Sequence, residues 1–171
     1  FDVAYKDYHW MMNLTEEIFE KVTLTLHGQT KISVGDNHIE FAGPYPRLSI
    51  SEAILKYSGV NVDELSEDEL RAKCTSFGME VDAQMGKGKL IDELFGEKVE
   101  ANLIQPTFII DYPVEMSPLT KKHRSKEGLV ERFELFVNGK EIANAYSELN
   151  DPIDQKERFE DQLKLAEKGD D

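Results

Sequence analysis

The sequence has little cysteine, few basic residues and no long apolar run. Cys74 is the only cysteine, which excludes an internal disulfide framework and a cysteine-rich zinc module. Since no stretch approaches the ~20 apolar residues of a membrane helix and no secretory signal opens the chain, we expect a cytoplasmic protein. The sequence has 20 basic and 34 acidic residues, a net charge of −14. This charge excludes a protein whose surface mainly binds phosphate groups.

The remaining composition is that of a folded domain. Hydrophobic residues make up 40% of the 171 positions, and a chain of this length buries roughly 70% of its unfolded surface. The sequence begins at Phe1 without Met and ends just after a helical pattern. We therefore expect a segment of a longer protein.

Periodicity and capping signals predict an α+β fold, with an antiparallel β-sheet and flanking helices. The first helix is expected over 7–26, with Met11, Leu14, Ile18, Val22 and Leu26 forming one apolar stripe. Capping boxes predict helices at 49–57 and 66–76, and an Asp-Pro start predicts one at 151–168. Another helix is predicted at 89–101, with Leu90, Leu94 and Val99 facing inward. Hairpins are predicted at 31–41 and 132–147, and a buried strand at 106–112. The helices of about 50–103 form a predicted insertion or subdomain.

The second hairpin carries two acidic side chains in a defined register. Its Asn138-Gly139 turn pairs Val137 with Lys140, Phe136 with Glu141, Leu135 with Ile142 and Glu134 with Ala143. Glu134 and Glu141 then lie diagonally on one face, with Cα atoms roughly 7–8 Å apart. Two such carboxylates suit Mg²⁺ bound together with substrate phosphates. The alternative is that both glutamates lie on a solvated sheet face.

Three further side chains alternate along the second strand of this hairpin. Strict alternation places Asn144, Tyr146 and Glu148 together, on the face opposite to the two glutamates. A carboxylate and an aromatic face would suit a ligand with an ammonium group. The alternative is an ordinary half-polar strand.

Three stretches of sequence resemble class II lysyl-tRNA synthetases. They are Arg132 to Asp151 (RFELFVNGKEIANAYSELND) with Pro152 and Gln155, Gln105 to Pro113 (QPTFIIDYP) with 116–119 (MSPL), and Val3 to Tyr8 (VAYKDY). The resemblance covers essentially the whole chain. It implies an incomplete class II catalytic core, the part between the second and third signature motifs, without the anticodon-binding domain.

The resemblance also implies an activity and a set of site residues. The family activates lysine with ATP and Mg²⁺, transfers it to tRNA(Lys), and works as a homodimer. Glu134 and Glu141 match the Mg²⁺–ATP glutamates, and Asn144, Tyr146 and Glu148 match the lysine-binding positions. The motif arginines lie outside the segment, so no catalytic residue is assigned here and the isolated segment is expected to be inactive.

The resemblance and strict alternation disagree about the second strand. The family places both sets of residues around one site, whereas alternation separates them. We therefore predict a β-bulge or sharp bend near Ala143-Asn144, where small side chains permit it.

The run Lys121, Lys122, Arg124 and Lys126 is the one local basic cluster. It is either a solvated loop or a mobile loop that contacts tRNA phosphates. Three other functions remain for the whole chain: a paralogue that attaches lysine to elongation factor P, a non-catalytic module that keeps the fold, and an unrelated acidic metal-binding hydrolase.

Overall fold

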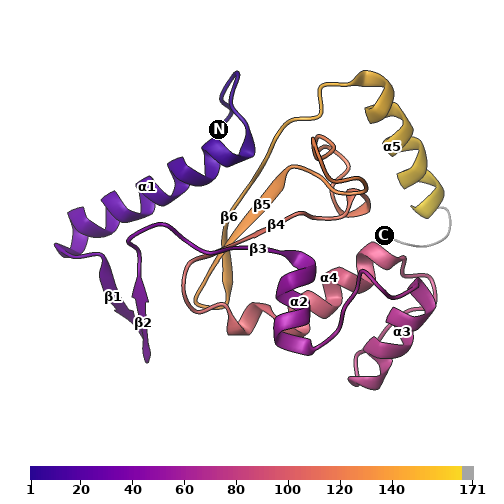
Figure 1. The fold of residues 1–171 in the computed structure, drawn as a ribbon, viewed down its shortest axis with the longest axis horizontal. Helices are drawn as coiled ribbons and strands as arrows, with labels where there is room; N and C mark the ends of the chain where they lie inside the picture. Colours follow the sequence, from indigo (N-terminus) through magenta and orange to yellow (C-terminus); the bar gives the residue numbers. More distant parts are fainter. Residues whose placement is uncertain (167–171) are drawn as a thin grey trace.

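The computed structural model describes residues 1–166, which form a four-stranded sheet with helices on both faces (Figure 1). The sheet order is β3-β4-β5-β6, comprising Arg47–Ser49, Thr107–Ile110, Arg132–Val137 and Lys140–Tyr146. A separate hairpin consists of β1 (Lys31–Val34) and β2 (Asn37–Glu40). The predicted α+β class is confirmed. The pair β3–β4 is parallel, so the sheet is mixed rather than wholly antiparallel.

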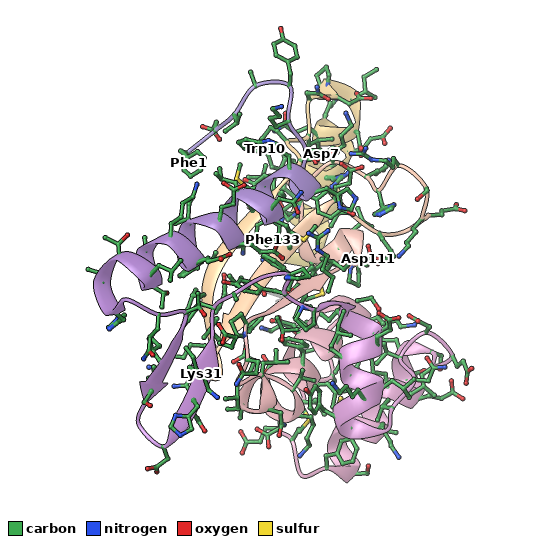
Figure 2. The ribbon with its side chains drawn as sticks, turned by 60° about the vertical axis from the view of Figure 1, so that its left-hand side comes forward. Phe1, Asp7, Trp10, Lys31, Asp111 and Phe133 are labelled. Atoms are coloured by element: carbon green, nitrogen blue, oxygen red, sulfur yellow. The ribbon has the colours of Figure 1, made fainter. Side chains whose placement is uncertain are left out.

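The first helix, α1 (Tyr8–His27), begins and ends within one residue of the predicted range 7–26. The side chain of Asp7 accepts a hydrogen bond from the Trp10 backbone N–H, and Gly28 ends the helix in the left-handed conformation. The helix crosses one face of the sheet, over Phe133 (Figure 2).

The predicted apolar stripe of α1 is wrong as a core face. Val22 and Leu26 are 49% and 72% exposed, whereas the buried residues of the helix are Tyr8, Met12 and Thr23. Thr23 can be buried at little cost because its hydroxyl donates to the Phe19 carbonyl at 2.7 Å. The sheet therefore packs against a face of α1 that lies beside the predicted apolar stripe.

The other face of the sheet is covered by three helices, α2 (Ile50–Ser58), α3 (Glu67–Ser76) and α4 (Lys87–Lys98), followed by the 3₁₀ turn η1 (Glu100–Asn102). Both predicted capping boxes are present, at Ser49 and Ser66. The predicted inward residues Leu90, Leu94 and Val99 are fully buried. This cluster packs on the sheet through Ile109 and Phe136.

The last helix, α5 (Pro152–Ala166), starts at the predicted Asp-Pro signal, with Asp151 capping the backbone N–H of Ile153 at 2.9 Å. The final residues of the predicted helix, to Lys168, lie outside the described residues. The turn η2 (Val114–Met116) and an irregular loop connect β4 to β5. No helix within residues 1–166 is both long and apolar enough to span a membrane.

Candidate substrate site on the free edge of the sheet

The β5–β6 hairpin holds the predicted site residues, and its register contains one irregularity. Val137 pairs with Lys140 and Phe136 with Glu141, as predicted from the Asn-Gly turn. Beyond that point Leu135 pairs with Ala143 and Glu134 with Asn144, so the predicted partners Ile142 and Ala143 are wrong by one residue. Ile142 is the extra residue of a β-bulge, one position before the predicted irregularity.

The bulge changes which side chains share a face. Without the bulge, Asn144 and Tyr146 would point to the α1 side of the sheet. In the structure Ala143 and Ala145 lie there instead and pack beside the core of that face. With it, Asn144 lies directly opposite Glu134, and Tyr146 lies opposite Arg132. The two residue sets that strict alternation separates therefore lie together on the face that carries Glu134.

Glu134 is held by three neighbouring side chains. Its Oε2 accepts from the Tyr112 hydroxyl at 2.8 Å, and its Oε1 accepts from Asn144 Nδ2 at 3.2 Å and from the Arg132 guanidinium. The guanidinium carbon of Arg132 lies 4.8 Å from the centre of the Tyr112 ring, a cation–π arrangement. The carboxylate is thus fixed in direction with its side chain only 12% exposed.

The electrostatic environment of Glu134 is unfavourable for its negative charge. Burial raises the pKa of Glu134, opposed by Arg132 and the Tyr112 hydroxyl and reinforced by the charges of Glu141 and Asp92. Burial, Asp92 and Glu141 likewise raise the pKa of Glu100. A cation placed between these carboxylates would relieve their repulsion.

The surroundings define what kind of cation fits. Within residues 1–166 no three His, Cys, Asp or Glu side chains form a ready-made metal cluster. Glu141 is exposed, and with Glu134 it offers two carboxylates on one face. Mg²⁺ bound through substrate phosphates and water commonly uses one or two protein carboxylates, so this pair fits that mode better than an all-protein cage.

The positions predicted to bind lysine follow along β6. Asn144 accepts from Arg132 Nε at 3.3 Å through its Oδ1, so its amide is oriented by the same network as Glu134. Tyr146 ends the strand with its side chain partly exposed. Glu148 is exposed just past the strand, where the backbone forms an isolated bridge with Thr120.

Comparison of the sequence with known proteins shows which family the chain belongs to. The family described as "tRNA synthetases class II (D, K and N)" matches residues 1–171. The chain belongs to the class II tRNA synthetases. It is 61% identical over 169 residues to a lysine–tRNA ligase of Porphyromonas gingivalis, 59% identical over 169 residues to that of Christiangramia forsetii and 55% identical over 168 residues to that of Azobacteroides pseudotrichonymphae.

These alignments include 98–99% of this chain but only 29–34% of each relative. The chain thus spans about a third of the length of the curated relatives it matches.

Two residues of this synthetase segment that hold Glu134, Arg132 and Tyr112, are not among the predicted site residues. Arg132 is two positions earlier on the same strand, and alternation alone places the two side chains on one face. Tyr112 has no such signal, because it reaches Glu134 from the end of β4, 22 residues away in sequence.

The basic loop is more strongly tied to the fold than its composition indicated. Lys122 pairs with Asp154 on α5 at 3.0 Å, and Lys126 pairs with the buried Asp111 at 2.5 Å. Arg124 pairs with two carboxylates. In the part of the chain that the structure describes, Lys121 is the one base of this cluster for which no ion pair forms.

Proposed function

We propose that this chain supplies the Mg²⁺–ATP and lysine-binding part of an enzyme that activates lysine and transfers it to tRNA(Lys). The observation that carries the proposal is the Ile142 bulge, because it gathers Glu134, Glu141, Asn144 and Tyr146 on one sheet face. The names of the relatives, lysine–tRNA ligases, agree with this substrate choice. The full-length enzyme would be a homodimer.

The two glutamates would bind ATP together with its Mg²⁺. Glu134 is preorganised by Tyr112, Arg132 and Asn144, so binding the metal requires little rearrangement of its carboxylate. Glu141 is exposed and free to approach the phosphates. A Mg²⁺ ion held by these two residues would neutralise charge on the phosphate oxygens, which would lower the repulsion that an incoming carboxylate meets.

The lysine substrate would lie along β6. The carboxylate of Glu148 provides the countercharge for the ε-ammonium group, and the ring of Tyr146 provides a cation–π surface. Asn144 offers its amide, already oriented by Arg132. These contacts distinguish lysine from amino acids of similar size that lack a terminal positive charge.

The chemistry then follows in two transfers. An oxygen of the lysine carboxylate attacks the α-phosphorus of ATP, a new O–P bond forms, and pyrophosphate leaves as the bond to the β-phosphate breaks. A terminal ribose hydroxyl of tRNA next attacks the lysyl carbonyl carbon, giving lysyl-tRNA and AMP. Positioning and charge neutralisation dominate such steps, and the residues of this chain contribute both.

Pyrophosphate exchange in the full-length enzyme tests this assignment. Glu134→Gln and Glu141→Gln should each lower kcat by about 100- to 1,000-fold, the usual effect of removing one preorganised electrostatic group. Glu148→Gln should instead raise the KM for lysine by about tenfold or more, because the ε-ammonium group loses its charged partner. Glu17→Gln, on the exposed side of α1, is the control, and equal effects of all four changes would contradict the assignment.

The chain alone should not activate lysine. The arginines that the family uses at the phosphates belong to the two flanking motifs, and ATP affinity should collapse without them. Exchange by the 171-residue chain at the rate of the full-length enzyme would disprove this expectation.

The basic loop leads to a separate proposal about tRNA. Lys121, exposed and outside the ion pairs of its neighbours, would contact acceptor phosphates, whereas Lys122 and Arg124 would contribute only if their pairs open. Charge reversal at Lys121 and Lys122 in the full-length enzyme should raise the KM for tRNA and leave lysyl-adenylate formation intact. Unchanged tRNA kinetics would remove the loop from the tRNA interface.

A further inference from the structure

Three distant segments meet at Ser147, the residue between the proposed lysine-binding residues Tyr146 and Glu148. The backbone N–H of Ser147 donates to the Glu131 carbonyl at 2.9 Å, and its own carbonyl accepts from the Lys121 N–H at 2.9 Å. The Lys121 carbonyl in turn accepts from the Glu131 N–H at 3.0 Å. The three backbone segments thus close a ring of hydrogen bonds, and none can shift without moving the other two.

Side chains fasten the same junction to the start of α1. The buried hydroxyl oxygen of Ser147 accepts from the backbone N–H of Tyr8 at 3.2 Å. Arg124 donates from Nε to Glu131 Oε1 at 2.5 Å and from Nη2 to Glu131 Oε2 at 2.9 Å, and Nη2 also reaches Asp7 at 3.0 Å. Asp7, which is labelled in Figure 2, caps the N-terminal end of α1. A single guanidinium therefore joins the loop, the start of β5 and the cap of α1.

The carboxylate of Glu131 remains charged in a buried place. Glu131 is 1% exposed. Although burial raises its pKa, the hydrogen bonds from Arg124 and Ser147 and the charge of Arg124 outweigh burial and lower the pKa to about 2. A two-point Arg–carboxylate contact fixes both groups in angle as well as in distance. Such a pair gives the Ser147 backbone a defined position rather than a range of positions.

We propose that Arg124 and Glu131 are positioning residues for lysine recognition, because their ion pair holds the Ser147 junction and thereby aims the side chains of Tyr146 and Glu148. The inference rests on the proposed function of those two residues. Neither Arg124 nor Glu131 is placed in contact with lysine, so the effect is on the geometry of the pocket. Glu134 and Glu141 lie farther along the hairpin, toward its Asn-Gly turn, so ATP binding should be spared.

The test uses pyrophosphate exchange in the full-length enzyme, with lysine and ATP varied separately. Arg124→Met should raise the KM for lysine by about ten- to 100-fold, the usual cost of a small misplacement of binding groups. The KM for ATP should stay within about twofold. Arg124→Lys should give an intermediate lysine KM, since lysine keeps the charge but loses the two-point contact.

Arg71→Met is the matched control. Arg71 also bonds a glutamate, Glu67 at 2.7 Å, and the backbone carbonyl of Asp82 at 2.6 Å, but it lies in α3, away from the junction. Its loss should leave the KM for lysine unchanged. If Arg124→Met does not fold, the double change Arg124→Met with Glu131→Gln removes the unpaired buried charge as well and carries the same expectation.

Glu148→Gln separates failure of this inference from failure of the proposed function. If Glu148→Gln raises the KM for lysine and Arg124→Met does not, the positioning role is overturned while lysine recognition stands. If Glu148→Gln itself leaves the KM for lysine unchanged, the lysine pocket and the positioning role both fail. An equal rise of the lysine and ATP KM values in Arg124→Met would show general disruption and would also overturn the inference.

Discussion

The ion pair between Arg124 and Glu131 should stabilise this chain by an amount that can be worked out from the pKa of Glu131. We consider the substitution Glu131→Gln, which keeps the shape and one acceptor oxygen but removes the charge. A carboxyl pKa lowered from 4.5 to about 2 corresponds to about 3 kcal/mol in favour of the folded state at neutral pH. Arg124 is 55% exposed, so solvent screens part of this interaction. We therefore expect a loss of about 1–2 kcal/mol at pH 7.

The pH dependence has a definite sign. Because the folded-state pKa of Glu131 lies below its unfolded value, the ionised carboxylate stabilises the fold fully above about pH 4.5. This contribution is lost as the pH falls toward 2. The difference in unfolding free energy between the native chain and Glu131→Gln should therefore be constant from pH 7 to 5 and shrink below pH 4.5.

Urea unfolding followed by circular dichroism at pH 7, 5 and 3.5 measures this difference. The control is Glu17→Gln, because Glu17 pairs with Lys21 at 3.3 Å on an exposed helix surface, where such pairs contribute little. The reasoning is refuted if Glu131→Gln costs as much at pH 3.5 as at pH 7. A loss at pH 7 no larger than that of the control would refute it equally.

Three other substitutions test the fold by the shift of the urea midpoint. Leu94→Ala should cost about 2–5 kcal/mol, because Leu94 is fully buried between α4 and its neighbours; a cost below 1 kcal/mol would mean that the helices repack. Gly139→Ala should cost about 1–2 kcal/mol, since φ is +71° and the new Cβ would lie 3.4 Å from Ala101 Cα; a neutral result would contradict the close approach. Ser49→Ala should cost about 1 kcal/mol through loss of the α2 capping box, and no change would remove its role as a cap.

The elements that the sequence predicted well depend on local chemistry. The Ser49 and Ser66 capping boxes, the Asp151 cap and the Asn138-Gly139 turn each act over three or four residues, so their signals do not depend on the rest of the fold. Both central residues of that turn have positive φ values, 54° and 71°, the conformation that an Asn-Gly pair adopts readily.

The features that were not predicted depend on distant partners. The three-residue strand β3 exists only because β4, about 60 positions later, pairs with it. Packing against the sheet determines which face of α1 is buried. Met12 and Thr23 are buried there, whereas the more apolar Val22 and Leu26 are exposed. Likewise, Arg124 reaches Glu131 from the basic loop and Tyr112 reaches Glu134 from just beyond β4, and no sequence period relates either pair.

The candidate site depends both on the local Asn-Gly turn and on a β-bulge at one residue, Ile142. An Asn-Gly turn fixes the register at one end of the hairpin, and it is correct for the two pairs nearest the turn. Beyond them, the insertion of Ile142 shifts every later residue of β6 to the opposite face. Asn144 and Tyr146 therefore join Glu134, while Ala143 and Ala145 turn toward α1, where small side chains are needed beside the helix. A regular hairpin would place Asn144 and Tyr146 under α1 and the alanines beside the glutamates, so the bulge both packs the helix and assembles the site.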